Sequence, residues 1–219
     1  MPKRALLAAL LLLSAPLASA SAAEHPQRHL TKAGRAAAAV AAVTPADLDQ
    51  SLAWSANPAA PAQGPAGQDC PSFHPRRADL VINGTAAASF SNAARGISIA
   101  STTGVYETPA MVRLLVRRTF APPQLLPCVG ELARRALPKT LRVVSVRRLP
   151  FAGVGRFTVA WRMTVELRAS HERLWIDQVA FGRGRTEIVV SSTYPQGAAG
   201  TAQPIEEHVV RALAARIRA

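Results

Sequence analysis

The stretch from Gly155 to Arg168 alternates strictly between two kinds of side chain, and it constrains the fold more than any other feature. Its apolar members are Phe157, Val159, Trp161, Met163, Val165 and Leu167. Because successive side chains of a β-strand point to opposite faces, this period of two predicts a long strand with one face against a core. Polar residues, Arg156 and Arg162 among them, are expected on the opposite, solvated face.

Neighbouring segments supply strands to pair with it. Residues 141–149, 174–181 and 186–194 are rich in β-branched and apolar residues, and Gly182-Arg183-Gly184-Arg185 is typical of a hairpin turn. The last two strands and the alternating one should form an antiparallel meander. Earlier in the chain, Leu80–Tyr106 contains shorter apolar stretches separated by Asn83-Gly84 and Asn92, which are hairpin and turn signals.

Helix signals surround these strands. Thr44-Pro45 and Thr108-Pro109 each place an N-cap residue before a proline suited to the first helical position. The expected helices cover 31–43, 44–54, a segment from 108 that stops before Pro122-Pro123, a segment that starts at Cys128 and ends at Pro138, and 204–218. The last carries apolar residues at every fourth position and should lie on the sheet. The sequence therefore predicts an α+β fold, an antiparallel β-sheet with helices packed on one face.

The N-terminus has the form of a secretory signal peptide. Lys3 and Arg4 precede the apolar run 5–13, and Ala18-Ser19-Ala20 offers the small residues that signal peptidase requires. We expect residues 1–20 to be removed, although cleavage after Ala22 or Ala23 meets the same rule. A retained anchor is the alternative, but the run is shorter than the roughly 20 apolar residues of a spanning helix. The mature protein is expected to be secreted, extracytoplasmic and soluble.

The remaining chain divides into two parts. Residues 21–69 form an Ala- and Pro-rich segment with a short helix, and 70–219 form a single α+β domain. Cys70 and Cys128 are the only cysteines. In an exported protein such a pair is interpreted first as a disulfide, and the wide spacing with no CxxC motif argues against metal or redox chemistry.

The chain is strongly basic, with a formal net charge of +13. Nearly all the positive charge is arginine and alanine is also abundant, a combination that compositional bias produces. The functional alternative is attraction to an anionic envelope polymer or lipid. Nucleic acid is not expected as a partner, because no dense basic run, aromatic platform or named motif is present.

No recognisable catalytic constellation is present. The sequence lacks a G-x-S-x-G elbow and an S-x-x-K motif, and its histidines are scattered, so we expect no enzyme, no cofactor and no metal site. Trp161 and Trp175 lie on neighbouring strands and are either core residues or the walls of a pocket for a small apolar ligand. Four arginines are candidates for anion binding on a strand face and a hairpin: Arg156, Arg162, Arg183 and Arg185.

The order of these pieces resembles a group of small exported actinobacterial proteins. The residues that carry the resemblance are Thr44-Pro45-Ala46-Asp47-Leu48, Trp54, Cys70-Pro71, Pro127-Cys128, Arg147-Arg148-Leu149-Pro150 and the 182–185 hairpin. These proteins are similar to the extracellular sensor domain of PknH-type kinases and to LpqN-type lipoproteins. The resemblance implies a PsbP-like fold used for binding. This chain has neither a lipobox cysteine nor a kinase segment.

Together these observations favour an exported, non-catalytic binding or sensor-like domain of the cell envelope. A protein-interaction or structural cell-wall protein is one alternative, and a hydrolase without a recognisable motif is another.

Overall fold

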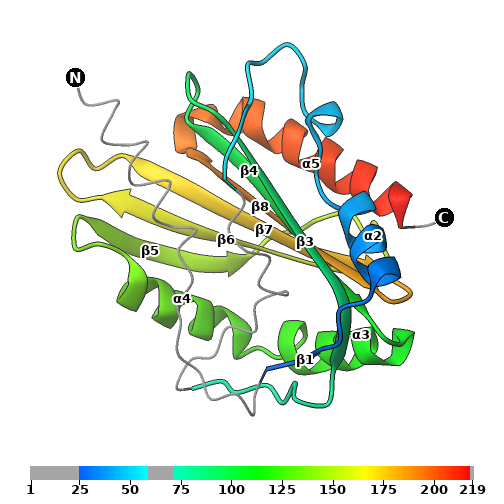
Figure 1. The fold of residues 1–219 in the computed structure, drawn as a ribbon. Helices are drawn as coiled ribbons and strands as arrows, with labels where there is room; N and C mark the ends of the chain where they lie inside the picture. The colour runs from blue at the N-terminus through cyan, green and yellow to red at the C-terminus, as the bar shows by residue number, and fades with distance from the viewer. Residues whose placement is uncertain (1–24, 59–71, 218–219) are drawn as a thin grey trace.

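A computed structural model describes residues 25–58 and 72–217 (Figure 1). The signal peptide, residues 59–71 of the Pro-rich connector and Cys70 lie outside the described residues. The strands are β1 (Gln27–Arg28), β2 (Ser55–Ala56), β3 (Val81–Asn92), β4 (Ile97–Tyr106), β5 (Leu141–Arg148), β6 (Phe157–Leu167), β7 (Arg173–Arg183) and β8 (Thr186–Pro195). The helices are α2 (Lys32–Val40), α3 (Pro109–Leu115), α4 (Leu125–Ala136) and α5 (Ala199–Arg216), with short 3-10 turns at Pro45–Asp47 and Gln196–Ala198 and a π-helical segment at Val116–Phe120.

One sheet organises the molecule, in the order β1-β3-β4-β8-β7-β6-β5 with β2 paired to β3. The meander of β6, β7 and β8 is confirmed, and Gly184 at φ +58° provides the left-handed residue of the β7–β8 turn. The α+β class is confirmed as well. The sheet is mixed rather than purely antiparallel, because the short β1 pairs parallel with β3.

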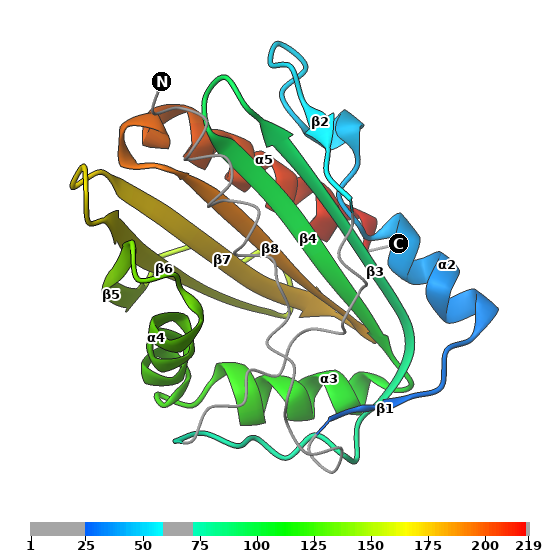
Figure 2. The same ribbon diagram turned by 60° about the vertical axis from the view of Figure 1, so that its left-hand side comes forward.

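The expectation that helices cover a single face is wrong. Figure 2 shows α5 behind the sheet and α3 and α4 in front of it. One core cluster joins α5 to Ile99, Val179 and Ile188, and a second joins α3 and α4 to Trp161 and Ala180. The strands are apolar on both faces where helices cover them, and two core layers result.

Strand β3 continues through Asn83-Gly84, where the sequence predicted a turn. The register of β3 on β4 shifts there, between Ile82 and Gly84, as a β-bulge. Gly84 has a packing role, because a Cβ at Gly84 or at Gly34 of α2 would overlap main-chain atoms of the other segment. The alanine-rich helix α2, which has few bulky residues, docks through this close approach and buries Ala38.

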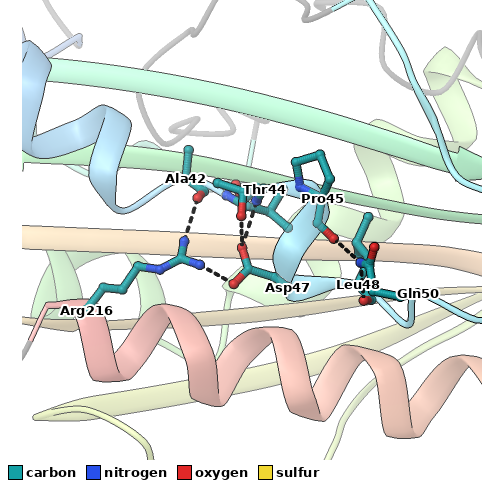
Figure 3. Close-up of polar contacts among 9 residues, drawn as sticks. Ala42, Thr44, Pro45, Asp47, Leu48, Gln50 and Arg216 are labelled. Atoms are coloured by element: carbon teal, nitrogen blue, oxygen red, sulfur yellow. Dashed lines mark hydrogen bonds and ion pairs between the residues drawn. The ribbon is translucent and has the colours of Figure 1, made fainter.

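The Thr44-Pro45 signal forms one turn of 3-10 helix instead of a longer helix ending near Trp54. Asp47 accepts hydrogen bonds from Thr44 N at 2.7 Å and from Thr44 Oγ1 at 2.8 Å (Figure 3). Arg216, near the end of α5, pairs with Asp47 and donates to the carbonyl of Ala42 at 3.0 Å. The N-terminal segment is thus fastened to the C-terminal helix.

The other helix signals agree with the structure. Thr108 caps α3 by accepting a hydrogen bond from Met111 N, and α4 ends before Pro138. The C-terminal helix begins at Ala199, five residues earlier than expected. Cys128 is fully buried in the first turns of α4. Since Cys70 is not described, the Cys70–Cys128 bridge stays a prediction.

Among the described residues, no helix combines the length and apolar character needed to cross a membrane.

Candidate functional site

A pocket of about 190 Å³ opens on the sheet face that carries α3 and α4. Its floor comes from the four central strands β4, β8, β7 and β6, and its wall comes from the π-helical segment and the start of α4. The lining residues are Ala100, Ser101, Thr102, Thr119, Phe120, Leu125, Trp161, Gln178, Val189 and Ser191. Ser101 contributes main chain, because its hydroxyl accepts a hydrogen bond from Val43 N on the opposite face.

Aromatic rings form one side of this pocket. The ring centroid of Phe120 lies 6.3 Å from that of Trp161 at an interplanar angle of 33°, and 6.2 Å from that of Phe157 in a stacked arrangement. The Phe120 carbonyl accepts a hydrogen bond from Arg148 at 3.0 Å. This contact ties the wall of the pocket to the edge strand β5 and holds the aromatic group in place.

Four polar side chains line the same pocket: Thr102, Thr119, Gln178 and Ser191. None of them makes a side-chain hydrogen bond within residues 25–58 and 72–217. Thr119 is only 4% exposed, and its Oγ1 is buried without a partner. Buried hydroxyls are normally hydrogen-bonded, so this pocket has polar capacity that the described protein does not use.

The opposite face holds a polar cluster of a different kind. Arg162 donates to both carboxylate oxygens of Asp177 at 2.6 Å, and Tyr194 Oη donates to Asp177 at 2.5 Å. The Arg162 guanidinium also lies 3.7 Å from the centroid of the Trp175 ring. Burial lowers the pKa of Arg162, but the hydrogen bond and charge of Asp177, together with the charges of Tyr194 and Glu206, outweigh burial and raise this pKa. This network is hydrogen-bonded and closed, which suits a structural role.

Glu206 of α5 lies over this network. It is 3% exposed, and its Oε2 has no hydrogen-bond partner although Ser192 is beside it. Burial first, and then the charge of Asp177, raise the pKa of Glu206 to about 8. At neutral pH the carboxyl is therefore mostly protonated.

The structure separates the residues that the sequence grouped. Trp161 faces α4 and lines the pocket, whereas Trp175 lies on the α5 face against Arg162, so the two tryptophans share no pocket. Arg162 is buried and not on a solvated face, because its strand is covered on both sides. The other three candidates, Arg156, Arg183 and Arg185, are exposed around the β7–β8 turn.

A second hollow, of about 240 Å³, lies where the end of α4 meets the first residues of β5. It is lined by Arg134, Leu137, Leu141, Arg142, Val143 and Arg168. Arg142 pairs with Glu166 at 2.9 Å, while Arg134 and Arg168 have no ion pair within the described chain. None of these three arginines is among the anion-binding candidates predicted from the sequence.

Sequence reasoning found one pocket residue, Trp161, and missed the others. Gln178 carried a usable signal, because it is the polar member of an otherwise apolar row on β7 formed with Leu174, Ile176 and Ala180. Thr119 and Phe120 carried none, since their position depends on how the π-helical segment meets the sheet. In the described ranges, no group of three histidine, cysteine or carboxylate side chains could hold a metal ion.

No protein-family model matches the chain. A comparison with curated proteins also finds no match. Among solved structures, an uncharacterised protein from Mycobacterium smegmatis, an Rv0999 ortholog, is similar with 12% identity and a TM-score of 0.38, over 77% of this chain and 87% of that one. This likeness is too distant to support an argument about function.

Proposed function

We propose that this protein is an exported, non-catalytic binding domain that holds a small ligand in the pocket between the sheet and the α3–α4 segment. The observation that carries the proposal is the partly enclosed lining, where four unpaired polar side chains converge beside an aromatic wall. Apolar walls with a few convergent polar groups are the usual make-up of small-molecule sites. Within the described part of the chain, the lining has no acidic, basic or histidine side chain, which supports binding rather than acid–base chemistry.

A thermal-shift screen of the mature chain against small ligands tests this proposal. A ligand that binds only the folded state adds RT ln(1 + [L]/Kd) to the free energy of unfolding and so raises the midpoint of unfolding. Ser191→Leu narrows the pocket and should abolish the shift. Thr193→Leu is the matched control, because Thr193 lies on the same face of β8 but outside the lining. Equal shifts in both variants would rule out this pocket as the binding site.

Export and the disulfide belong to the same proposal. The N-terminal residues of a signal peptide, the oxidising environment it leads to and the burial of Cys128 support a Cys70–Cys128 bridge in the mature protein. We further propose a sensor-like role of the kind that the PknH- and LpqN-type resemblance implies. Peptide mapping of secreted protein without reduction should give one fragment containing both cysteines and a mature N-terminus between residues 21 and 24.

Binding of an anionic envelope component is a second candidate function. The hollow at Arg134, Arg142 and Arg168 supports it, because three arginines from separate segments line this space. Of the three, Arg142 forms an ion pair, with Glu166. Binding to anionic vesicles should weaken as salt is added. The variant Arg134→Gln/Arg168→Gln should bind less than Arg183→Gln/Arg185→Gln, which removes the same charge at the hairpin. Equal loss in both would indicate nonspecific attraction.

A further inference from the structure

The lining of the pocket specifies the class of ligand, an inference that rests on the proposed function. We infer that the ligand is a small uncharged molecule with one planar ring and a hydrogen-bond acceptor, such as a carbonyl oxygen, that receives a hydrogen bond from Thr119.

The absence of charge among the lining residues is the first support. The chain has 26 basic and 13 acidic side chains, yet none of the ten residues that line this pocket is ionisable. A charged ligand entering here would lose hydration and find no counter-charge in the lining, which is unfavourable. The pocket should therefore discriminate against anions and cations alike, although the protein as a whole is strongly basic.

The shape and size of the pocket indicate a ring. Phe120 and Trp161 present aromatic surface on one side, Leu125 and Val189 add aliphatic surface, and Ala100 contributes a small side chain to the floor. Aromatic side chains pack well against a planar partner through offset or edge contacts. A volume of about 190 Å³ is below the roughly 300 Å³ at which sites for drug-sized molecules begin, so one ring with a small substituent fits best.

Thr119 supplies the specific polar contact. Its hydroxyl is buried without a partner among the described residues, which costs free energy in the empty protein, and this cost is recovered when the side chain turns towards the pocket and donates to a ligand. Thr119 also belongs to the π-helical segment Val116–Phe120, and interruptions of this kind occur frequently at functional sites. Gln178 and Ser191, on the floor, can complete the hydrogen bonding of the same polar group.

Four single-ring probes test the inference: benzamide, toluene, benzoate and benzylammonium. Binding is followed by two-dimensional amide and indole NMR, with Trp161 Nε1–H as the reporter inside the pocket. Benzamide should bind at least tenfold more tightly than either charged probe. Toluene should also bind, but more weakly, because it lacks an acceptor.

Two variants at one position test the role of Thr119. Thr119→Val keeps the shape and removes the hydroxyl, so benzamide should bind roughly tenfold more weakly while toluene binding stays the same. Thr119→Ser keeps the hydroxyl and should retain benzamide binding. The amide spectrum of each variant without ligand verifies that the fold is intact.

The outcomes distinguish a failure of the proposed small-ligand function from a failure of the inferred ligand class. If no probe shifts the Trp161 signal, the proposed small-ligand function itself fails. If probes bind but benzoate or benzylammonium matches benzamide, the pocket stands and the inference of an uncharged ligand is overturned. If Thr119→Val binds benzamide as tightly as the unchanged protein, the assignment of the hydrogen bond to Thr119 is wrong.

Discussion

The two faces of the sheet differ in how fully their buried polar groups are hydrogen-bonded. On the α5 face, Arg162, Asp177 and Tyr194 satisfy one another through four hydrogen bonds, and Trp175 covers the guanidinium. On the α3–α4 face, the hydroxyls of Tyr106 and Thr119 and both carboxyl oxygens of Glu187 are buried without a hydrogen-bond partner among residues 25–58 and 72–217. Burial raises the pKa of Glu187 well above its usual value, which favours the protonated carboxyl.

This difference separates a structural core from a surface prepared for a ligand. A satisfied network stabilises one arrangement of the strands and helix α5, and leaves nothing for another molecule to bind. Unsatisfied groups lower stability, and they persist where another requirement outweighs that cost. Within the described residues, the α5 face leaves Ser192 Oγ and Glu206 Oε2 without a partner and the pocket face leaves more such atoms, and this imbalance supports the proposed function.

Breaking the satisfied network should have the largest effect. In Asp177→Asn the guanidinium of Arg162 stays buried but loses its carboxylate partner, so the free energy of unfolding should fall by ~3–5 kcal/mol in urea titrations. Arg162→Met/Asp177→Leu removes both charges together and should recover most of that loss. Glu207→Gln, which breaks the exposed pair with Arg211, is the control and should change stability by less than ~0.5 kcal/mol. A loss below ~1 kcal/mol in Asp177→Asn would contradict the structural role.

Glu206 is an exception on the α5 face, because its carboxyl is not fully hydrogen-bonded. We expect it to make the free energy of unfolding depend on pH, with an effect of intermediate size. The unfolded carboxyl loses its proton near 4.5, while the folded one keeps it to about 8. The unfolded state is thus favoured progressively across that interval, and the stability present below pH 4.5 is lost as pH rises towards 8. Between pH 6 and 8 the loss should be about 2 kcal/mol.

Glu206→Gln tests this linkage, because glutamine does not titrate. Urea titrations at both pH values should show a smaller loss of stability in the variant than in the unchanged protein. Equal losses of stability in the variant and the unchanged protein would show that other groups cause the pH dependence.

The smallest effect is expected on the pocket face, with the opposite sign. Thr119→Val removes a buried hydroxyl that has no partner, so the free energy of unfolding without ligand should rise by about 1 kcal/mol. Thermal and urea unfolding measure it, with Thr103→Val as the matched control on the other face. Thr103 donates to the carbonyl of Ala41 at 3.2 Å, so its replacement should destabilise. If both variants are destabilised, the unpartnered hydroxyl of Thr119 and the hydrogen-bonded hydroxyl of Thr103 do not differ in their effect on stability.

Local patterns in the sequence predicted most of the individual elements. The alternation in residues 157–167, the turn at Gly184 and the Thr-Pro caps at 44 and 108 depend on neighbours in the chain, and the structure has each of them. The turn predicted at Asn83-Gly84 is wrong, because the same residues suit both a turn and a close crossing of two backbones. Only the approach of α2, more than forty residues earlier in the chain, distinguishes these two uses.

The sequence by itself determined the four strands of the second half, the meander and the α+β class, because these follow from periodicity and turn chemistry over a few residues. Tertiary structure alone decided that helices cover both faces, that Trp161 and Trp175 lie on opposite sides, and that Arg162 is buried. It also brought Thr119 and Phe120 beside Gln178 and Ser191. These outcomes depend on which distant segments pack together, and burial and hydrogen-bond satisfaction are properties of that packing rather than of any local pattern.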